Sequence, residues 1–170
     1  MKSGKNKVKT RIEKDSLGEI EIPADAYYGV QTMRAVHNFP VSGWKAHPVM
    51  VDSYVYIKKA AAITNASLGI LDNKIAGAIV KAADEVLSGK LRDHFVVDVY
   101  QAGAGTSQNM NANEVIANRA LEILKSKKGD YRLIHPNDHV NMAQSTNDTI
   151  PASIYISAFE AVQEDLLPVL

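Results

Sequence analysis

Apolar residues recur at helical spacing in four stretches of the chain, and each stretch is long enough to form a helix. Capping and breaking residues separate these stretches, because a glycine favours a helix end and an aspartate can cap a helix start. We therefore expect four helices. The first would lie between Pro48 and Gly69, and the second between Asp72 and Gly89. The third would lie between the glycine-rich segment 98–108 and Gly129, and the fourth between the polar segment 135–148 and the apolar stretch 165–170.

A different pattern precedes these helices. Between Arg11 and Pro23 apolar and polar residues alternate on either side of Ser16-Leu17-Gly18, which predicts a small β-hairpin. Residues 31–39 can form one or two helical turns, and Pro40 then ends them. The sequence therefore predicts a mainly α protein with a small amino-terminal β-hairpin.

Composition narrows the class of protein. The 170 residues are 46% hydrophobic, which suits one domain with a buried core, and 19 basic residues balance 19 acidic ones. The balanced charge gives no indication of nucleic-acid binding, and no apolar run approaches the roughly 18–20 residues that span a membrane. Residues 1–10 are basic and lack an apolar segment, so we expect a disordered tail rather than a secretory signal. Cysteine is absent, which excludes disulfides and is compatible with a cytoplasmic location.

The first candidate binding segment is the glycine-rich loop Gly103–Asn109, which runs into a predicted helix. Glycine allows a close backbone approach, and the start of a helix offers N–H donors and positive potential to an anion. Thr106 adds a hydroxyl donor. The alternative is a tight turn in which Thr106 or Ser107 only caps the helix. A nucleotide site is disfavoured, because no lysine follows as in a Walker loop and no βαβ pattern precedes.

The second candidate is Gln144–Asp148, which also precedes a predicted helix and includes Ser145, Thr146 and Asn147. Capping by one of these polar residues is again the alternative to ligand binding. Two helix starts rich in donors could bind the two carboxylates of one small diacid, and this binding would need no metal.

The segment His135–Asn141 contains two histidines four residues apart, a spacing that can bind a metal on a helix. Pro136 and the neighbouring Asn and Asp residues disfavour a regular helix through both of them. We therefore favour structural histidines, or a polar loop able to bind an anion, over a metal site.

The segments GAGTSQNMNANEVIANRA (Gly103–Ala120) and HPNDHVNMAQSTND (His135–Asp148) resemble two signature regions of the aspartase/fumarase superfamily, and PADAYYGVQT resembles its amino-terminal region. The likeness covers nearly the whole chain after about residue 10. It implies a mostly helical subunit of three domains in a homotetramer whose active sites combine three subunits. Residues 11–143 would be the first domain, and residues 144–170 would begin a long helix of the central bundle, truncated at Leu170.

The resemblance also implies roles for individual residues. Thr106 would contact one substrate carboxylate, Ser145 and Thr146 would bind the carboxylate next to the carbon that loses its proton, and Asn147 would face the amino or hydroxyl group. His135, Asn137 and Asp138 resemble the loop of a second, non-catalytic anion site in fumarases. The base, a serine, would lie further along a longer protein, so this chain alone would hold no catalytic base and would be inactive. No cofactor or metal is implied.

Two positions favour one branch of the family. Fumarases commonly have GSGT and SSND where this chain has GAGT with Ala104 and STND with Thr146. The resemblance therefore implies reversible deamination of L-aspartate to fumarate and ammonia. The alternatives are a class II fumarase, which hydrates fumarate to malate, and a non-catalytic helical interaction domain whose partner covers the apolar residues 165–170.

Overall fold

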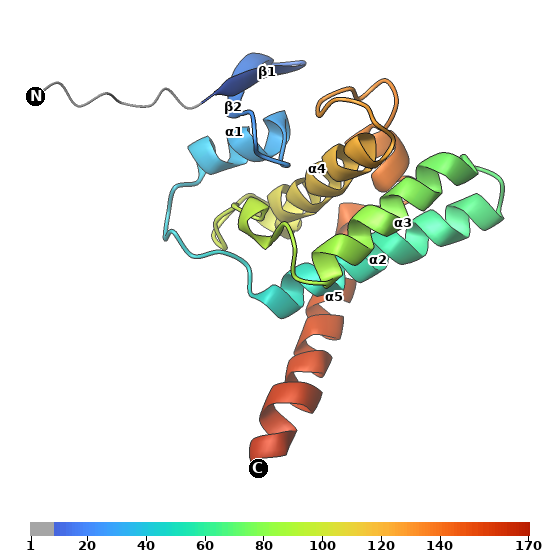
Figure 1. Cartoon of the computed structure of the whole chain (residues 1–170). Coiled ribbons are helices and arrows are strands. Elements are labelled where there is room, and N and C mark those ends of the chain that lie inside the picture. Colours follow the sequence, from blue (N-terminus) through green and yellow to red (C-terminus); the bar gives the residue numbers. More distant parts are fainter. Residues whose placement is uncertain (1–8) are drawn as a thin grey trace, which may run out of the picture.

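The structure is a computed structural model that describes residues 9–170. Within residues 9–170, two strands and five α-helices follow one another, with short 3₁₀ and π turns between them (Figure 1). The predicted tail, residues 1–10, lies mostly outside the described residues, and its last residue already belongs to the first strand. In residues 9–170 no helix is both long and apolar enough to cross a membrane. The predicted mainly α class with a small hairpin is confirmed.

The hairpin consists of β1 (Thr10–Asp15) and β2 (Gly18–Pro23), which pair antiparallel. Asp15 pairs with Gly18, so Ser16 and Leu17 form the turn, as the sequence predicted. Gly18 has a φ of +115°, a conformation that residues with a Cβ rarely adopt.

The next three helices also match the sequence pattern. They are α1 (Val30–Asn38), α2 (Pro48–Ser67) and α3 (Asn73–Leu87). Asp72 caps α3 as predicted, since its carboxylate accepts hydrogen bonds from the N–H groups of Lys74 and Ile75.

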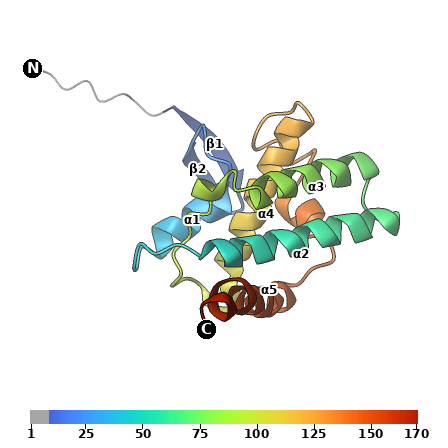
Figure 2. The ribbon, with the colours of Figure 1, turned by 60° about the horizontal axis from the view of Figure 1, so that its bottom comes forward.

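The core forms where α2, α3 and α4 (Thr106–Ile123) pack together. In two views α2 and α3 lie side by side, and α4 crosses next to them (Figure 2). α4 is the most enclosed helix, because its buried residues lie all around it and include polar side chains. These polar residues are Ser107, Gln108, Asn109, Asn111, Asn113, Glu114 and Asn118.

The predicted end of α4 at Gly129 is wrong. The helix ends at Ile123, and Lys125 follows with a left-handed φ of 62°. The N–H of Lys125 donates to the carbonyl of Glu122, and the N–H of Ser126 donates to the carbonyl of Leu121. These two bonds form a Schellman motif, so a lysine occupies the position that glycine usually takes.

The last helix, α5 (Thr146–Ala161), departs from the expected burial pattern. Its buried residues are Thr149, Ile150 and Ser153, near its start. Large apolar residues further along are exposed, with Phe159 at 68%, because α5 packs on one side against α2 and its later part projects beyond the other helices (Figure 1). The stretch Val162–Val169 continues as π and 3₁₀ turns.

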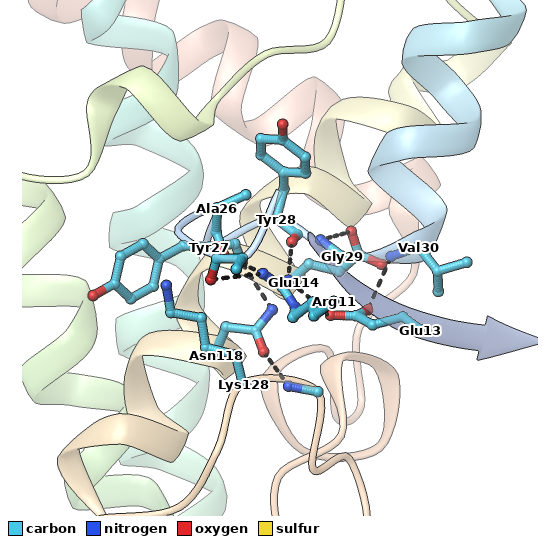
Figure 3. Close-up of polar contacts among 12 residues, drawn as sticks. Arg11, Glu13, Ala26, Tyr27, Tyr28, Gly29, Val30, Glu114, Asn118 and Lys128 are labelled. Carbon is cyan, nitrogen blue, oxygen red and sulfur yellow. Dashed lines mark hydrogen bonds and ion pairs between the residues drawn. The ribbon is translucent and has the colours of Figure 1, made fainter. Parts of the chain in front are cut away.

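The buried carboxylates of Glu114 on α4 and Glu13 on β1 both bind the segment at the start of α1. Glu114 accepts hydrogen bonds from the backbone N–H groups of Gly29, Gln31 and Thr32, at 2.8, 2.9 and 3.0 Å. It therefore satisfies N–H groups at the start of α1, which has no side-chain cap of its own. Figure 3 shows Glu114 pointing at this segment from α4.

A second carboxylate and an arginine complete this network. Glu13 accepts hydrogen bonds from the N–H of Val30 at 3.1 Å and from the Tyr131 hydroxyl at 2.9 Å, and it pairs with Arg11 at 2.7 Å. Arg11 also donates to the carbonyls of Ala26 and Tyr28, both at 2.7 Å (Figure 3). The PADAYYGVQT segment is thus anchored by side chains distant in sequence.

The Glu114 carboxyl should make folding stability depend on pH. Burial raises the pKa of Glu114 to about 6, while its three N–H donors oppose that change. Because the folded state then binds the proton more tightly than the unfolded state does, protonation of Glu114 stabilises the fold. This stabilising contribution is fully present below pH 4.5 and is lost as the pH rises through 6. We expect the unfolding free energy of the wild type, relative to Glu114→Gln, to fall by about 2 kcal/mol between pH 4 and 7.

Denaturant titrations at several pH values measure this difference. Glu19→Gln is the matched control, since Glu19 is exposed on β2, and its difference from the wild type should change little with pH. A difference for Glu114→Gln that increases with pH would show that the N–H donors outweigh burial.

Candidate functional site

The backbone of the glycine-rich loop adopts positive φ angles, which favour glycine and other small residues. Gly103–Gly105 form a short 3₁₀ turn in which Ala104 has a φ of 57° and Gly105 a φ of 69°. A Cβ on Gly105 would lie 2.7 Å from Cδ1 of Ile150 on α5. Gly105 is thus required both by its conformation and by the close approach of α5.

The alternative in which Thr106 or Ser107 caps α4 is wrong. The capping residue is Gly105, and α4 has no side-chain cap. Thr106 is exposed, and its hydroxyl donates only a long bond of 3.4 Å to the carbonyl of Gly103. Gln101 accepts a hydrogen bond from the N–H of Gln108 at 2.8 Å, so this side chain holds the loop against the helix start.

Capping is confirmed at the second segment. Ser145 caps α5, and its hydroxyl oxygen accepts a hydrogen bond from the N–H of Asn147 at 3.2 Å. Ser145 and Asn147 are exposed and Thr146 is half-buried, so a ligand can reach all three. Capping does not prevent a role in binding, because the hydroxyl proton of Ser145 can still be donated.

The structure brings the two candidate segments together. The side-chain amide of Asn109, in the first turn of α4, donates to the hydroxyl oxygen of Thr146 at 3.0 Å. Ile150, one turn further along α5, packs against Gly105. The first turns of α4 and α5 are therefore in direct contact, although nearly forty residues separate Thr106 from Thr146 in sequence.

A buried lysine lies beneath this junction. Lys58 on α2 is 0% exposed, and its Nζ donates to the side-chain oxygens of Asn109, Asn141 and Gln144 at 2.6, 2.7 and 2.9 Å. Burial lowers the pKa of Lys58 to about 7. The three hydrogen bonds oppose this change, because they match the three N–H groups of an ammonium.

Sequence reasoning missed Lys58, although one signal was present. Lys58 lies four residues after Tyr54 and four before Ala62, and both of these neighbours are buried. A lysine on the apolar stripe of a helix indicates either a long side chain that reaches solvent or a buried charge with polar partners. Its partners could not be identified before the fold was known, since they come from two distant segments.

The histidine segment forms its own local structure. His135 accepts hydrogen bonds through Nδ1 from the N–H groups of Asn137 and Asp138, at 3.2 and 3.3 Å. His139 accepts one through Nδ1 from the N–H of His135 at 2.8 Å, and Pro136–Val140 form a π turn. Within residues 9–170 no group of three or more His, Asp or Glu side chains is arranged to bind a metal. Both histidines thus stabilise this turn through local hydrogen bonds, and the second anion site stays a prediction.

An open cavity of about 580 Å³ is lined in part by the glycine loop. Its lining includes Gly103–Gly105 but not Thr106 or the turn 145–147, and apart from His47 it contains no group able to carry a positive charge. The candidate binding groups Thr106 and Ser145–Asn147 therefore lie outside this cavity.

Known proteins resemble this chain over most of its length. A family model described as "Lyase" matches residues 18–170. An aspartate ammonia-lyase from Bacillus sp is 56% identical over 91% of this chain, and a class II fumarate hydratase from Halobacterium salinarum is 54% identical over 93%. Each match covers 33% of the relative, so the chain spans about a third of the length of these proteins.

Solved structures agree with the sequence relatives. The crystal structure of a "fumarate lyase:delta crystallin" from Brucella melitensis matches with a TM-score of 0.89 and 52% identity, over 91% of this chain and 35% of the other. A class II fumarase from Schistosoma mansoni matches with a TM-score of 0.89 and 39% identity, over 94% and 34%. Relatives with the two activities are about equally similar. The chain thus belongs to the lyase family of the aspartate ammonia-lyases and class II fumarases, the aspartase/fumarase superfamily.

Proposed function

We propose that this chain is the amino-terminal part of an aspartate ammonia-lyase, which converts L-aspartate reversibly to fumarate and ammonia. The observation that carries the proposal is the contact between the glycine loop and the Ser145–Asn147 turn, made through Asn109 and Thr146. Hydroxyl and N–H donors from two helix starts then gather in one region, as a substrate with two carboxylates requires.

The residues at two positions support the ammonia-lyase over the fumarase. Ala104 takes the place of the serine that is common in fumarases, and the missing hydroxyl changes how the leaving group is bound. Thr146 takes the place of the second serine of SSND. A class II fumarase is the second candidate, because relatives with that activity are about as similar as the aspartases.

The chemistry explains why hydroxyls are needed. The reaction breaks a C–H bond beside a carboxylate, and that carboxylate must take up a second negative charge before the C–N bond breaks and ammonia leaves with the electron pair. Donors fixed around the carboxylate oxygens bind more strongly as charge develops, so they stabilise the transition state more than the substrate. We assign this role to Ser145 and Thr146. Thr106 would bind the second carboxylate, and Asn147 would face the amino group.

Other parts of the active protein lie beyond this chain. We infer that the base is a serine further along a full-length subunit, that the active enzyme is a homotetramer, and that it acts in the cytoplasm. Residues 144–170 would then begin the central helical bundle. The exposed apolar residues of α5, such as Phe159, support such a partner. By the same reasoning the segment alone would turn over no aspartate.

The test is an assay of the full-length protein with fumarate, with and without ammonia. We expect aspartate to form when ammonia is present and no malate to form when it is absent. Malate without ammonia would identify a fumarase instead. A full-length protein that forms neither product would favour a non-catalytic interaction domain.

A further inference from the structure

Lys58 carries a buried charge without a carboxylate partner. Its side chain is fully enclosed, and it forms no ion pair with any of residues 9–170. Three amide oxygens accept its hydrogen bonds, and amides are neutral, so they satisfy the N–H groups without cancelling the charge. Three acceptors match the three N–H groups of an ammonium, so this geometry favours the protonated amine and offsets part of its desolvation cost, and in that form the charge has no counter-ion.

The partners of Lys58 place this charge at the junction of the two candidate segments. Asn109 belongs to the first turn of α4, after the glycine loop, whereas Asn141 and Gln144 lie four residues and one residue before Ser145. Asn109 accepts from Lys58 through Oδ1 at 2.6 Å and donates through Nδ2 to Thr146 at 3.0 Å. Only one side chain thus separates the ammonium from the hydroxyl of Thr146.

We propose that Lys58 is a positioning residue that ties the glycine loop to the Ser145–Asn147 turn, and that its uncancelled charge increases the affinity of the site for a dianion. The inference rests on the proposed function, since it takes a dicarboxylate as the ligand. Lys58 does not touch the substrate. It acts through Asn109 and through its electric field, which weakens slowly with distance in a low-dielectric interior.

The first experiment measures succinate, a non-reacting dicarboxylate, binding to the full-length protein by isothermal titration calorimetry. Lys58→Met should raise the Kd of succinate about 10-fold or more, because the site loses a nearby positive charge. Lys59→Met is the matched control on the next residue. Lys59 is partly exposed and pairs with Asp84 at 2.6 Å, so its replacement should leave the Kd nearly unchanged.

A charge effect can be separated from a merely structural one with succinamate, the half-amide of the same length and one negative charge. Loss of the charge should weaken succinate binding more than succinamate binding, whereas a distorted site should weaken both equally. Equal losses for the two ligands, or an unchanged Kd for succinate, would overturn the inference.

Gln144→Glu gives a second test if Lys58→Met does not fold. A glutamate at 144 can keep the contact with Nζ, now as an ion pair, and its charge would offset that of the ammonium. The variant should melt at a lower temperature, because the Gln144 amide also donates to the carbonyls of Val140 and Met142 at 2.9 and 3.3 Å. We expect the folded variant to bind succinate more weakly, and wild-type affinity would contradict the inference. A wild-type protein that binds no succinate at all would contradict the proposed function instead.

Discussion

Thr146→Val is expected to lower kcat/KM of the full-length protein in the proposed ammonia-lyase reaction by about 10²-fold or more, because a single donor to a developing oxyanion contributes about 2.7–4 kcal/mol. Valine has nearly the shape of threonine but offers no hydroxyl. Thr146 is half-buried at the start of α5, where its oxygen already accepts a hydrogen bond from Asn109. Its proton is therefore free to point toward a ligand.

The loss should appear mainly in kcat, since the donor strengthens as charge develops. Thr149→Val is the matched control one turn later, because the Thr149 hydroxyl donates only to the carbonyl of Thr146 in the same helix. Steady-state kinetics of both variants, together with Thr146→Ser as a conservative replacement, measure the effect. A near-normal rate for Thr146→Val would remove this residue from the mechanism.

Gly29→Ala is expected to lower the unfolding free energy by about 2–6 kcal/mol, from overpacking together with lost hydrogen bonds of a buried carboxylate. The backbone of Gly29 is extended and tolerates any residue, so the cost is steric. The added Cβ would collide with the Tyr131 hydroxyl and would lie 2.8 Å from Oε2 of Glu13 and 2.9 Å from Cδ of Glu114. The network that anchors the hairpin and α1 would have to move apart.

Gly77→Ala provides a control for which we expect the opposite change in unfolding free energy. Gly77 lies inside α3, and a Cβ there would meet no atom within 4 Å. Alanine should stabilise this helix by about 1 kcal/mol, because it loses less backbone freedom on folding than glycine does. Chemical denaturation of the two variants and the wild type measures both changes, and equal stabilities of Gly29→Ala and the wild type would show that the network can relax.

The sequence alone determined the features that depend on neighbouring residues. The turn at Ser16-Leu17, the cap at Asp72 and the start of α2 at Pro48 follow from the conformations that these residue types favour. The two signature segments identified the family, because they are long and specific and the chain retains them. The same local reasoning failed at Lys125, where a Schellman motif ended α4 before the expected glycine.

Only the tertiary structure decided which polar groups are buried and what they contact. Glu114 and Lys58 look like ordinary charged residues of two helices, yet each binds backbone or side-chain groups more than fifty residues away in sequence. Helical spacing assigns a residue to a face but cannot say which distant segment covers that face. The helix α5 shows the reverse case, in which apolar residues are exposed. Its apolar residues recur at the same helical spacing as those of α3, but most of them are exposed on α5, whereas most are buried on α3. Burial and charge pairing are properties of the assembled fold, because they depend on contacts between segments that the sequence order keeps apart.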